Sequence, residues 1–185
     1  MPMKKEMTLT DLKRYLSNID DTEIKKLICH IYKNSEMAEK MINVLILGSE
    51  YEEKLLNQYK EKMYKVFFPN DIMRAGFSLS WAKSLIGEFK KICTETEYVL
   101  DLQLYYVECG TDFTNTFGGI DMKFYDSMCS VYHTVIQAVN NHENDHLYQK
   151  FEGRLYSIVK ETEGIGWGYH DYVSEQFFSI SWREE

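Results

Sequence analysis

The sequence contains few residues that interrupt regular backbone structure: among 185 residues there are only two prolines and ten glycines. Because proline and glycine are the strongest breakers of helices and strands, their scarcity predicts long regular elements. No stretch combines sustained alternation of apolar and polar residues with β-branched side chains, which is the pattern of a half-buried strand. The regular elements are therefore expected to be helices.

Cysteine is also sparse, and the four cysteines form no C-x-x-C pair. Each lies on or beside an apolar stripe with helical spacing, where free cysteine usually packs. This distribution predicts no disulfide framework and favours a reducing compartment, the cytoplasm. The cysteines are Cys29, Cys93, Cys109 and Cys129.

Long apolar runs are missing. The longest aliphatic run, Val44 to Leu47, is far shorter than the roughly 20 residues that a membrane-spanning helix needs. The first ten residues include Lys4 and Lys5 but no apolar segment after them, so we expect no secretory signal. No membrane association is expected.

Basic residues are outnumbered, with 21 Lys and Arg against 29 Asp and Glu and a formal net charge of −8. Nucleic-acid binding needs clustered Lys and Arg to neutralise phosphates, so a broad nucleic-acid surface is not expected. Residues 4–33 hold seven of the basic residues, and contact of this first part with nucleic acid is a weak alternative that the acidic remainder disfavours.

The apolar content is that of a folded protein: 44% of the residues are hydrophobic and 15% are aromatic. A chain of this length buries a sizeable core, and we expect a single domain over residues 1–185. Spacings of three and four between apolar residues predict eight or nine antiparallel helices, arranged as a bundle or as stacked helical hairpins in an all-α fold. The expected helix starts are at Thr8 or Thr10, Asp20 or Asp21, Ser35, Ser49, Ser78 or Ser80, Thr94 or Thr96, Asp121, about Asn144, and Tyr169, with a loop over residues 70–76.

The most apolar of these helices ends at Gly118 and carries apolar residues on two faces, which predicts burial between neighbours. A polar line runs between the two faces: Asp101, Glu108, Asp112 and Asn115. Glu108 and Asp112 are like charges one turn apart, which costs a helix about 0.2–0.5 kcal/mol. Either basic groups on packed neighbours neutralise these carboxylates, or they line a polar pocket for a ligand or a metal ion.

A glycine-rich segment, Gly164 to Gly168, precedes the last expected helix. It lacks the spacing of a dinucleotide-binding loop and the Lys-Ser/Thr of a phosphate-binding loop, so a tight turn around a buried Trp167 is favoured. His170 and Asp171 follow at the helix start, where the helix dipole favours an aspartate. If this loop folds against residues 112–115, Asp112, Asn115, Trp167, His170 and Asp171 form one polar cluster.

One short motif matches the metalloprotease pattern H-E-x-x-H, between His142 and His146. In that pattern two histidines one helical turn apart bind zinc, and the glutamate activates water. Here polar residues surround the motif and it falls at an expected helix break, so a polar turn between helices is favoured. His142 and His146 are weak metal candidates, and no cofactor is expected.

Four segments together resemble a known family: TLTDLKRYL at 8–16, KVFFP at 65–69, YYVECGTDFTNTFGGID at 105–121 and GIGWGYHD at 164–171. They are similar to a family of small, uncharacterised bacterial proteins that is catalogued as a domain of unknown function. The resemblance implies a helical, cytoplasmic bacterial protein. It implies no activity, and it transfers no functional residues.

Two functions from different classes remain. The first is a non-catalytic protein- or peptide-binding or scaffold module, since stacked helical hairpins form grooves. The second is an enzyme or metal-binding protein with a polar cluster around Glu108, Asp112, Asn115 and His170. Carboxylates that converge in a pocket and have perturbed pKa values would support the enzyme or metal-binding function. If Arg or Lys side chains neutralise these carboxylates, the main argument for that function is lost.

Overall fold

The computed structural model describes residues 6–70 and 78–183. In these ranges the protein forms nine α-helices and no strand, which confirms the all-α class. The loop expected over 70–76 lies, apart from Asn70, outside the described residues. The helices are α1 (Leu9–Leu16), α2 (Asp21–Asn34), α3 (Glu36–Leu47), α4 (Ser49–Phe67), α6 (Leu79–Ile92), α7 (Thr96–Phe117), α8 (Met122–Asn140), α9 (His146–Glu161) and α10 (Tyr169–Phe178).

Most helix starts follow the capping residues in the sequence. The side chains of Asp20, Ser35, Ser78 and Asp121 each accept hydrogen bonds from backbone N–H groups in the first turn of the following helix, which satisfies donors that a helix leaves unpaired. Thr8 forms a complete capping box at the start of α1. The last two helices are shorter than expected: the apolar pattern predicts helices over residues 144–164 and 169–182, whereas α9 covers His146–Glu161 and α10 covers Tyr169–Phe178.

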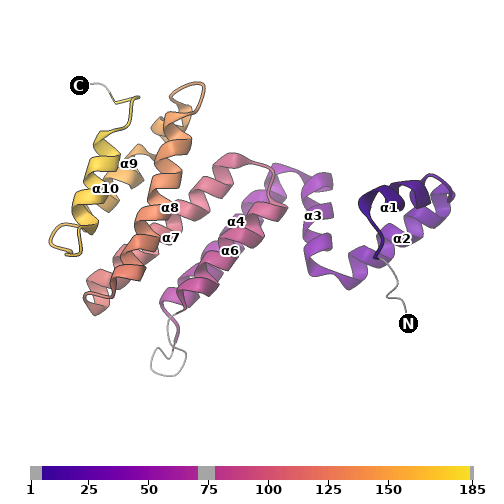
Figure 1. Ribbon diagram of the computed structural model, residues 1–185, viewed down its shortest axis with the longest axis horizontal. Coiled ribbons are helices and arrows are strands. Elements are labelled where there is room, and N and C mark those ends of the chain that lie inside the picture. The colour runs from indigo at the N-terminus through magenta and orange to yellow at the C-terminus, as the bar shows by residue number, and fades with distance from the viewer. Residues whose placement is uncertain (1–5, 71–77, 184–185) are drawn as a thin grey trace.

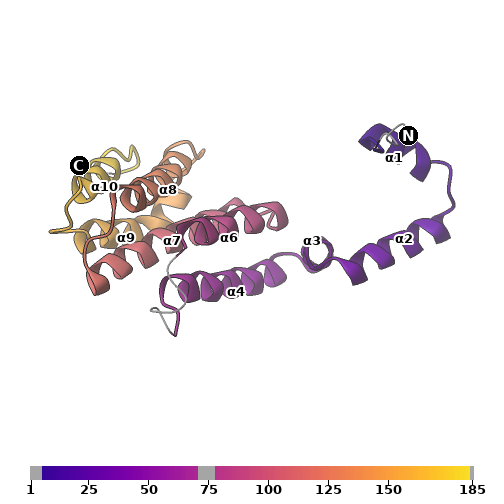
Figure 2. The ribbon, with the colours of Figure 1, turned by 60° about the horizontal axis from the view of Figure 1, so that its bottom comes forward.

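Helix α7 lies at the centre of the larger part of the molecule. It packs against α4, α6, α8 and α9, and α10 packs against α8 and α9 (Figures 1 and 2). Both faces of α7 are buried, including Leu102 on one stripe and Leu104 and Val107 on the other. The burial that the two apolar stripes predict is therefore confirmed.

The contact between α7 and α8 depends on a residue without a side chain. A Cβ atom on Gly110 would lie 2.2 Å from the Sδ atom of Met128 on α8. Met128 is fully buried, so its side chain occupies space that any larger residue at position 110 would need. Gly110 therefore leaves the space in which the Met128 side chain packs between the two helices.

Buried polar groups join neighbouring elements of this central part. The Glu52 carboxylate on α4 accepts hydrogen bonds from the backbone N–H and the hydroxyl of Thr94, just before α7. The Thr111 and Tyr169 hydroxyls lie 2.8 Å apart and connect α7 to α10. Pairing of this kind removes the cost of burying polar atoms.

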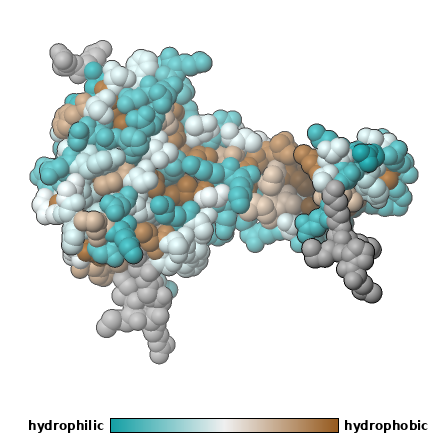
Figure 3. Space-filling model, in the orientation of Figure 1, coloured by the Kyte–Doolittle hydropathy of each residue, from teal (hydrophilic) through white to brown (hydrophobic). Residues whose placement is uncertain are grey.

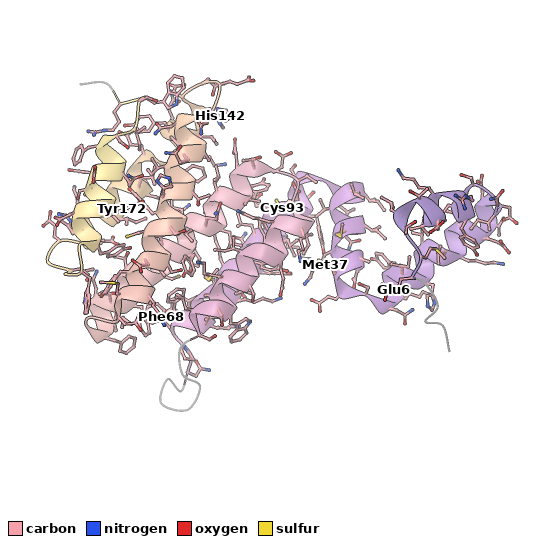
Figure 4. The ribbon with its side chains drawn as sticks, viewed as in Figure 1. Glu6, Met37, Phe68, Cys93, His142 and Tyr172 are labelled. Atoms are coloured by element: carbon pink, nitrogen blue, oxygen red, sulfur yellow. The ribbon has the colours of Figure 1, made fainter. Side chains whose placement is uncertain are left out.

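Helices α1 and α2 extend away from the remainder of the chain, and α3 joins them to it by packing against α4 and α6 (Figures 1 and 2). We call residues 6–47 the arm and residues 48–183 the body. Helices α1 and α2 bury no residue, and α3 buries only Val44. Met37 of α3 packs against the core of the body and is labelled in Figure 4. This projection is not evident from the sequence, whose apolar spacing in the arm resembles that of a packed helix.

Within the described residues, no helix has both the length and the apolar character that crossing a bilayer requires.

Replacement of Gly110 by alanine is expected to destabilise the fold by about 1–3 kcal/mol, because the added methyl group overpacks the α7–α8 contact. Gly87, on the exposed side of α6, provides the matched control, since a Cβ there meets nothing within 4 Å. Gly87→Ala should stabilise the protein by roughly 0.5–1 kcal/mol through helix propensity. Urea unfolding of both variants measures the difference, and equal effects would contradict the role of Gly110.

Candidate functional site

The polar line of α7 meets an arginine from α9. The Arg154 guanidinium donates to both carboxylate oxygens of Glu108, at 2.6 and 2.7 Å, and its Nη1 donates to Asp101 Oδ1 at 2.5 Å. Lys60 of α4 lies 2.8 Å from the same Asp101 oxygen. These four charged groups, which we call the Arg154 cluster, connect three helices. A planar guanidinium suits such a two-carboxylate site better than lysine would.

The charges of the Arg154 cluster stabilise one another. Burial alone would raise the pKa of Asp101, but its hydrogen bonds and charge interactions with Lys60 and Arg154 outweigh burial and lower that pKa. Burial would lower the pKa of Arg154, and its two carboxylate partners raise it instead. The cluster therefore pairs two acidic side chains with two basic ones.

A shallow pocket of about 310 Å³ opens beside this cluster. Burial is the main cause that raises the pKa of Asp112, and the Glu108 charge adds to it. Burial likewise raises the pKa of Glu161, with further contributions from the Asp112 and Glu108 charges. Among the described residues, neither Asp112 nor Glu161 forms a salt bridge. The pocket is lined by Tyr64, Tyr105, Glu108, Cys109, Asp112, Arg154, Ser157, Ile158 and Glu161.

The glycine-rich loop lies against the end of α7, as the cluster hypothesis requires. The Asn115 side-chain amide donates to the Glu161 carbonyl at 2.9 Å, and Asn115 and Trp167 line one pocket of about 310 Å³. The sequence predicts a buried Trp167, and this prediction is wrong because the residue is 59% exposed. Its φ angle is 62°, and this left-handed conformation turns the chain into α10.

The predicted site residues therefore divide among several places. Glu108 and Asp112 line the pocket beside Arg154, whereas Asn115 and Trp167 line the pocket at the glycine-rich loop. His170 lies with its Nδ1 atom 3.0 Å from the Thr162 hydroxyl and lines neither pocket. Asp171 is exposed in the first turn of α10. The structure brings these residues to one end of the body without joining them in one cavity.

The H-E-x-x-H segment forms the turn between α8 and α9 (Figure 4). His142 Nδ1 lies 3.1 Å from the Asn144 carbonyl oxygen, and His146 Nδ1 lies 3.1 Å from Glu97 Oε1. Because only His146 belongs to a helix, the two histidines do not have the one-turn helical spacing that zinc binding uses. Across residues 6–70 and 78–183, no group of three His, Cys, Asp or Glu side chains has the geometry to hold a metal ion.

Comparison with known families covers nearly the whole chain. Residues 7–177 match DUF6155, a family of unknown function. The chain belongs to this family. No curated protein and no solved structure matches it. Membership in DUF6155 confirms the resemblance to an uncharacterised family, and the function has to be argued from the geometry.

Sequence reasoning missed the basic partners of the α7 carboxylates. Arg154 lies 46 positions after Glu108 and 53 positions after Asp101, and Lys60 lies 41 positions before Asp101. No local spacing therefore connects these basic residues to the carboxylates. One signal was available: Arg154 lies three residues after Phe151 and four before Ile158, which places it on the same face as these apolar residues, toward the packed neighbour. The sequence left open whether basic groups on packed neighbours neutralise the carboxylates of α7 or whether the carboxylates line a ligand pocket. Arg154, on a helix that packs against α7, is a basic group of the first kind.

Arg154→Ala is expected to destabilise the protein by about 1–3 kcal/mol, since it leaves Asp101 and Glu108 partly buried without their cation. The matched control is Lys150→Ala, which breaks the more exposed pair with Glu97 and should cost less than about 1 kcal/mol. Denaturant unfolding at neutral pH measures both. The folded pKa of Asp101 lies below its ordinary value of 3.8, so its contribution is complete above that pH and is lost as the pH falls below it. A cost for Arg154→Ala that did not shrink in acid would contradict the ion-pair account.

Asp112→Asn is expected to stabilise the protein at pH 7, because a carboxyl with a raised folded pKa is more easily ionised in the unfolded chain. The group is exposed, so we expect a rise in melting temperature of roughly 1–2 °C. The gain should disappear below pH 3.8, where both states are protonated. Asp171→Asn is the control, because it makes the same change in net charge at an exposed position. An equal rise in melting temperature for this variant would show that the effect comes from net charge and not from the raised pKa of Asp112.

Proposed function

We propose that this member of DUF6155 is a non-catalytic protein-binding module whose interaction surface is the arm. The observation that carries the proposal is the concentration of exposed apolar side chains on α1 to α3. Ten of the 17 large hydrophobic residues that are exposed in the described chain lie between positions 7 and 47. They are Met7, Leu9, Leu12, Tyr15, Ile28, Ile31, Met41, Leu45, Ile46 and Leu47.

Exposure on this scale is costly for a chain that works alone. Helices as short as α1 and α2, with 8 and 14 residues, are marginal in water without tertiary packing. Contiguous apolar patches beyond a few hundred Å² mark interaction sites on soluble proteins. The arm combines short helices with many exposed apolar side chains, and a bound protein would supply the packing that the body does not.

The patch is visible between the body and the outer arm helices, where brown surface covers α3 (Figure 3). At the end of α3, Leu45 and Ile46 are 77% and 74% exposed. Their side chains leave the helix on different sides, since they are consecutive in the chain. A partner that covers both must therefore enclose the end of α3, as a helix pair or a groove does.

The enzyme alternative has less support from the same residues. Glu108, whose place on an apolar helix suggested a ligand, has a basic partner in Arg154. Pairing with Arg154 accounts for this carboxylate without substrate or metal. Within the part of the chain that the structure describes, only Asp112 and Glu161 are carboxylates that have a raised pKa and no salt bridge, and both are exposed.

We place the module in the cytoplasm. All four cysteines are free thiols, and Cys93 and Cys109 are buried, where desolvation raises the pKa of each thiol to about 12. Thiols held in their neutral form are inert toward oxidation, and free cysteine is typical of reducing compartments.

Leu45→Glu/Ile46→Glu is expected to abolish binding to the partner, because two charges would be buried without counter-ions. Tagged full-length wild type and the double variant serve as bait in extracts of cells that express the protein, with quantitative mass spectrometry as the readout. A protein retained by the wild type should fall by at least about tenfold with the variant. It should then be purified and its affinity for both chains measured by calorimetry.

The control is Trp81→Glu, which places a charge at an exposed apolar residue of the body, 57% exposed on α6. It should retain the partner at the wild-type level. Recovery of the same proteins by all three chains, at the same levels, would refute the arm as the interaction surface.

A further inference from the structure

The outer face of α2 carries three isoleucines that no part of the chain covers completely. Ile28 and Ile31 are 47% and 44% exposed, and Ile24 is half-buried. Their spacing of four and three places them on one side of the helix. Leu27 points elsewhere, into an open groove of about 430 Å³ that separates α1 from α2. The three isoleucines, which we call the α2 strip, therefore remain available to another surface.

The α2 strip is part of a larger set of exposed apolar side chains. Ten large hydrophobic residues between positions 7 and 47 are 37–77% exposed, and Ile28 and Ile31 are two of them. A stable complex buries about 800 Å² on each partner, which is more than three isoleucines supply. A second copy that pairs through the α2 strip must therefore also contact other residues of the arm.

Charge favours a contact between arms over a contact with the body. Residues 6–47 contain six basic and seven acidic residues, so the arm is close to neutral. Residues 48–185 contain 13 basic and 22 acidic residues, so two bodies repel each other. Because the arm projects from the body, two arms can meet while the acidic bodies stay apart.

The order of charges along α2 sets a direction. Asp20, Asp21 and Glu23 lie at its start, and Lys33 is the charged residue of its last turn. Side by side and antiparallel, two copies of α2 place each acidic start next to a basic end, and their helix dipoles also oppose. A parallel pair would bring like charges together at both ends. Ile28 lies near the middle of α2, and Ile24 and Ile31 lie at equal distances from that middle.

From these observations we infer that the occupant of the arm is a second copy of this chain, with the α2 strips packed antiparallel across a twofold axis near Ile28. The inference rests on the proposed function and names its partner. A twofold contact of this kind is self-complementary, since the strip of each copy covers the strip of the other. Burial of the isoleucines would then supply the apolar contacts that α2 lacks in the isolated chain.

The first test measures the mass of the full-length protein by light scattering and sedimentation over a range of concentrations. Wild type should be a dimer, and Ile28→Asp should weaken dimerisation by at least about tenfold. Since α2 buries no residue in the single chain, the variant body should keep its helical circular dichroism and its unfolding transition. Ile28→Leu and Trp81→Asp, as apolar and remote controls, should remain dimeric. A wild type that is monomeric at every concentration overturns the inference.

The second test fixes the direction by disulfide cross-linking in a Cys29→Ser background. In the antiparallel pair, Ile28→Cys lies close to its own copy and should cross-link. Ile24→Cys alone should not, because its two copies are separated by roughly 10 Å along the axis, beyond the reach of a disulfide. A mixture of the Ile24→Cys and Ile31→Cys chains should cross-link. Efficient cross-linking of Ile24→Cys with itself would indicate a parallel pair and refute the arrangement.

The two tests separate the antiparallel dimer from the more general binding role of the arm. A monomer that still binds another protein through Leu45 and Ile46 would refute the second copy as the occupant and leave the binding module intact. A monomer for which neither arm variant changes any binding would refute both. A dimer that survives Ile28→Asp would place the contact outside the α2 strip and overturn the inference.

Discussion

The body depends on the burial of α7 from two sides. This burial brings acidic side chains of α7 close to packed neighbours, and one arginine, Arg154, pairs with two of them. A helix with apolar stripes on opposite faces must cover both, so α4, α6, α8 and α9 pack around it. Its polar line then lies close to packed neighbours, where Asp101 and Glu108 need a cation. Arg154 supplies that cation to both carboxylates, with Lys60 as a second partner of Asp101. The same contact therefore balances the charges of Asp101 and Glu108 and holds α4 and α9 against α7.

Much of the fold could be predicted from local sequence signals. The helical spacing gave the class and most helix positions, and short-range chemistry gave the caps at Asp20, Ser35 and Asp121. Errors at the ends of α9 and α10 arose where polar residues offer several possible starts or stops. The two buried faces of α7 were also evident, because burial on both sides requires apolar residues on both sides.

The candidate site could be predicted only in part, since its geometry depends on distant residues. Glu108 and Asp112 are recognisable as unusual from the sequence. Their environments differ because Arg154 forms a salt bridge with Glu108 but not with Asp112, and the sequence does not show this. The loop at Trp167 does lie against Asn115, yet its exposure follows from a left-handed backbone angle that composition does not specify. In the arm, an apolar stripe has the same spacing whether or not a neighbour covers it. Local sequence therefore cannot separate a core helix from an interaction helix.

The shape of the arm has a consequence for its dynamics. Amide hydrogens exchange with solvent through local opening, and segments with few buried contacts open at low cost in free energy. Helices α1 and α2 have no buried residue to resist such opening, whereas the helices around α7 open only when the core is disrupted. Under the proposed binding role, an occupant would raise the folded population of the arm by mass action, and folding of these two helices would become part of the binding reaction. A contact formed in this way has a lower affinity for its area, because ordering the segment consumes part of the binding free energy.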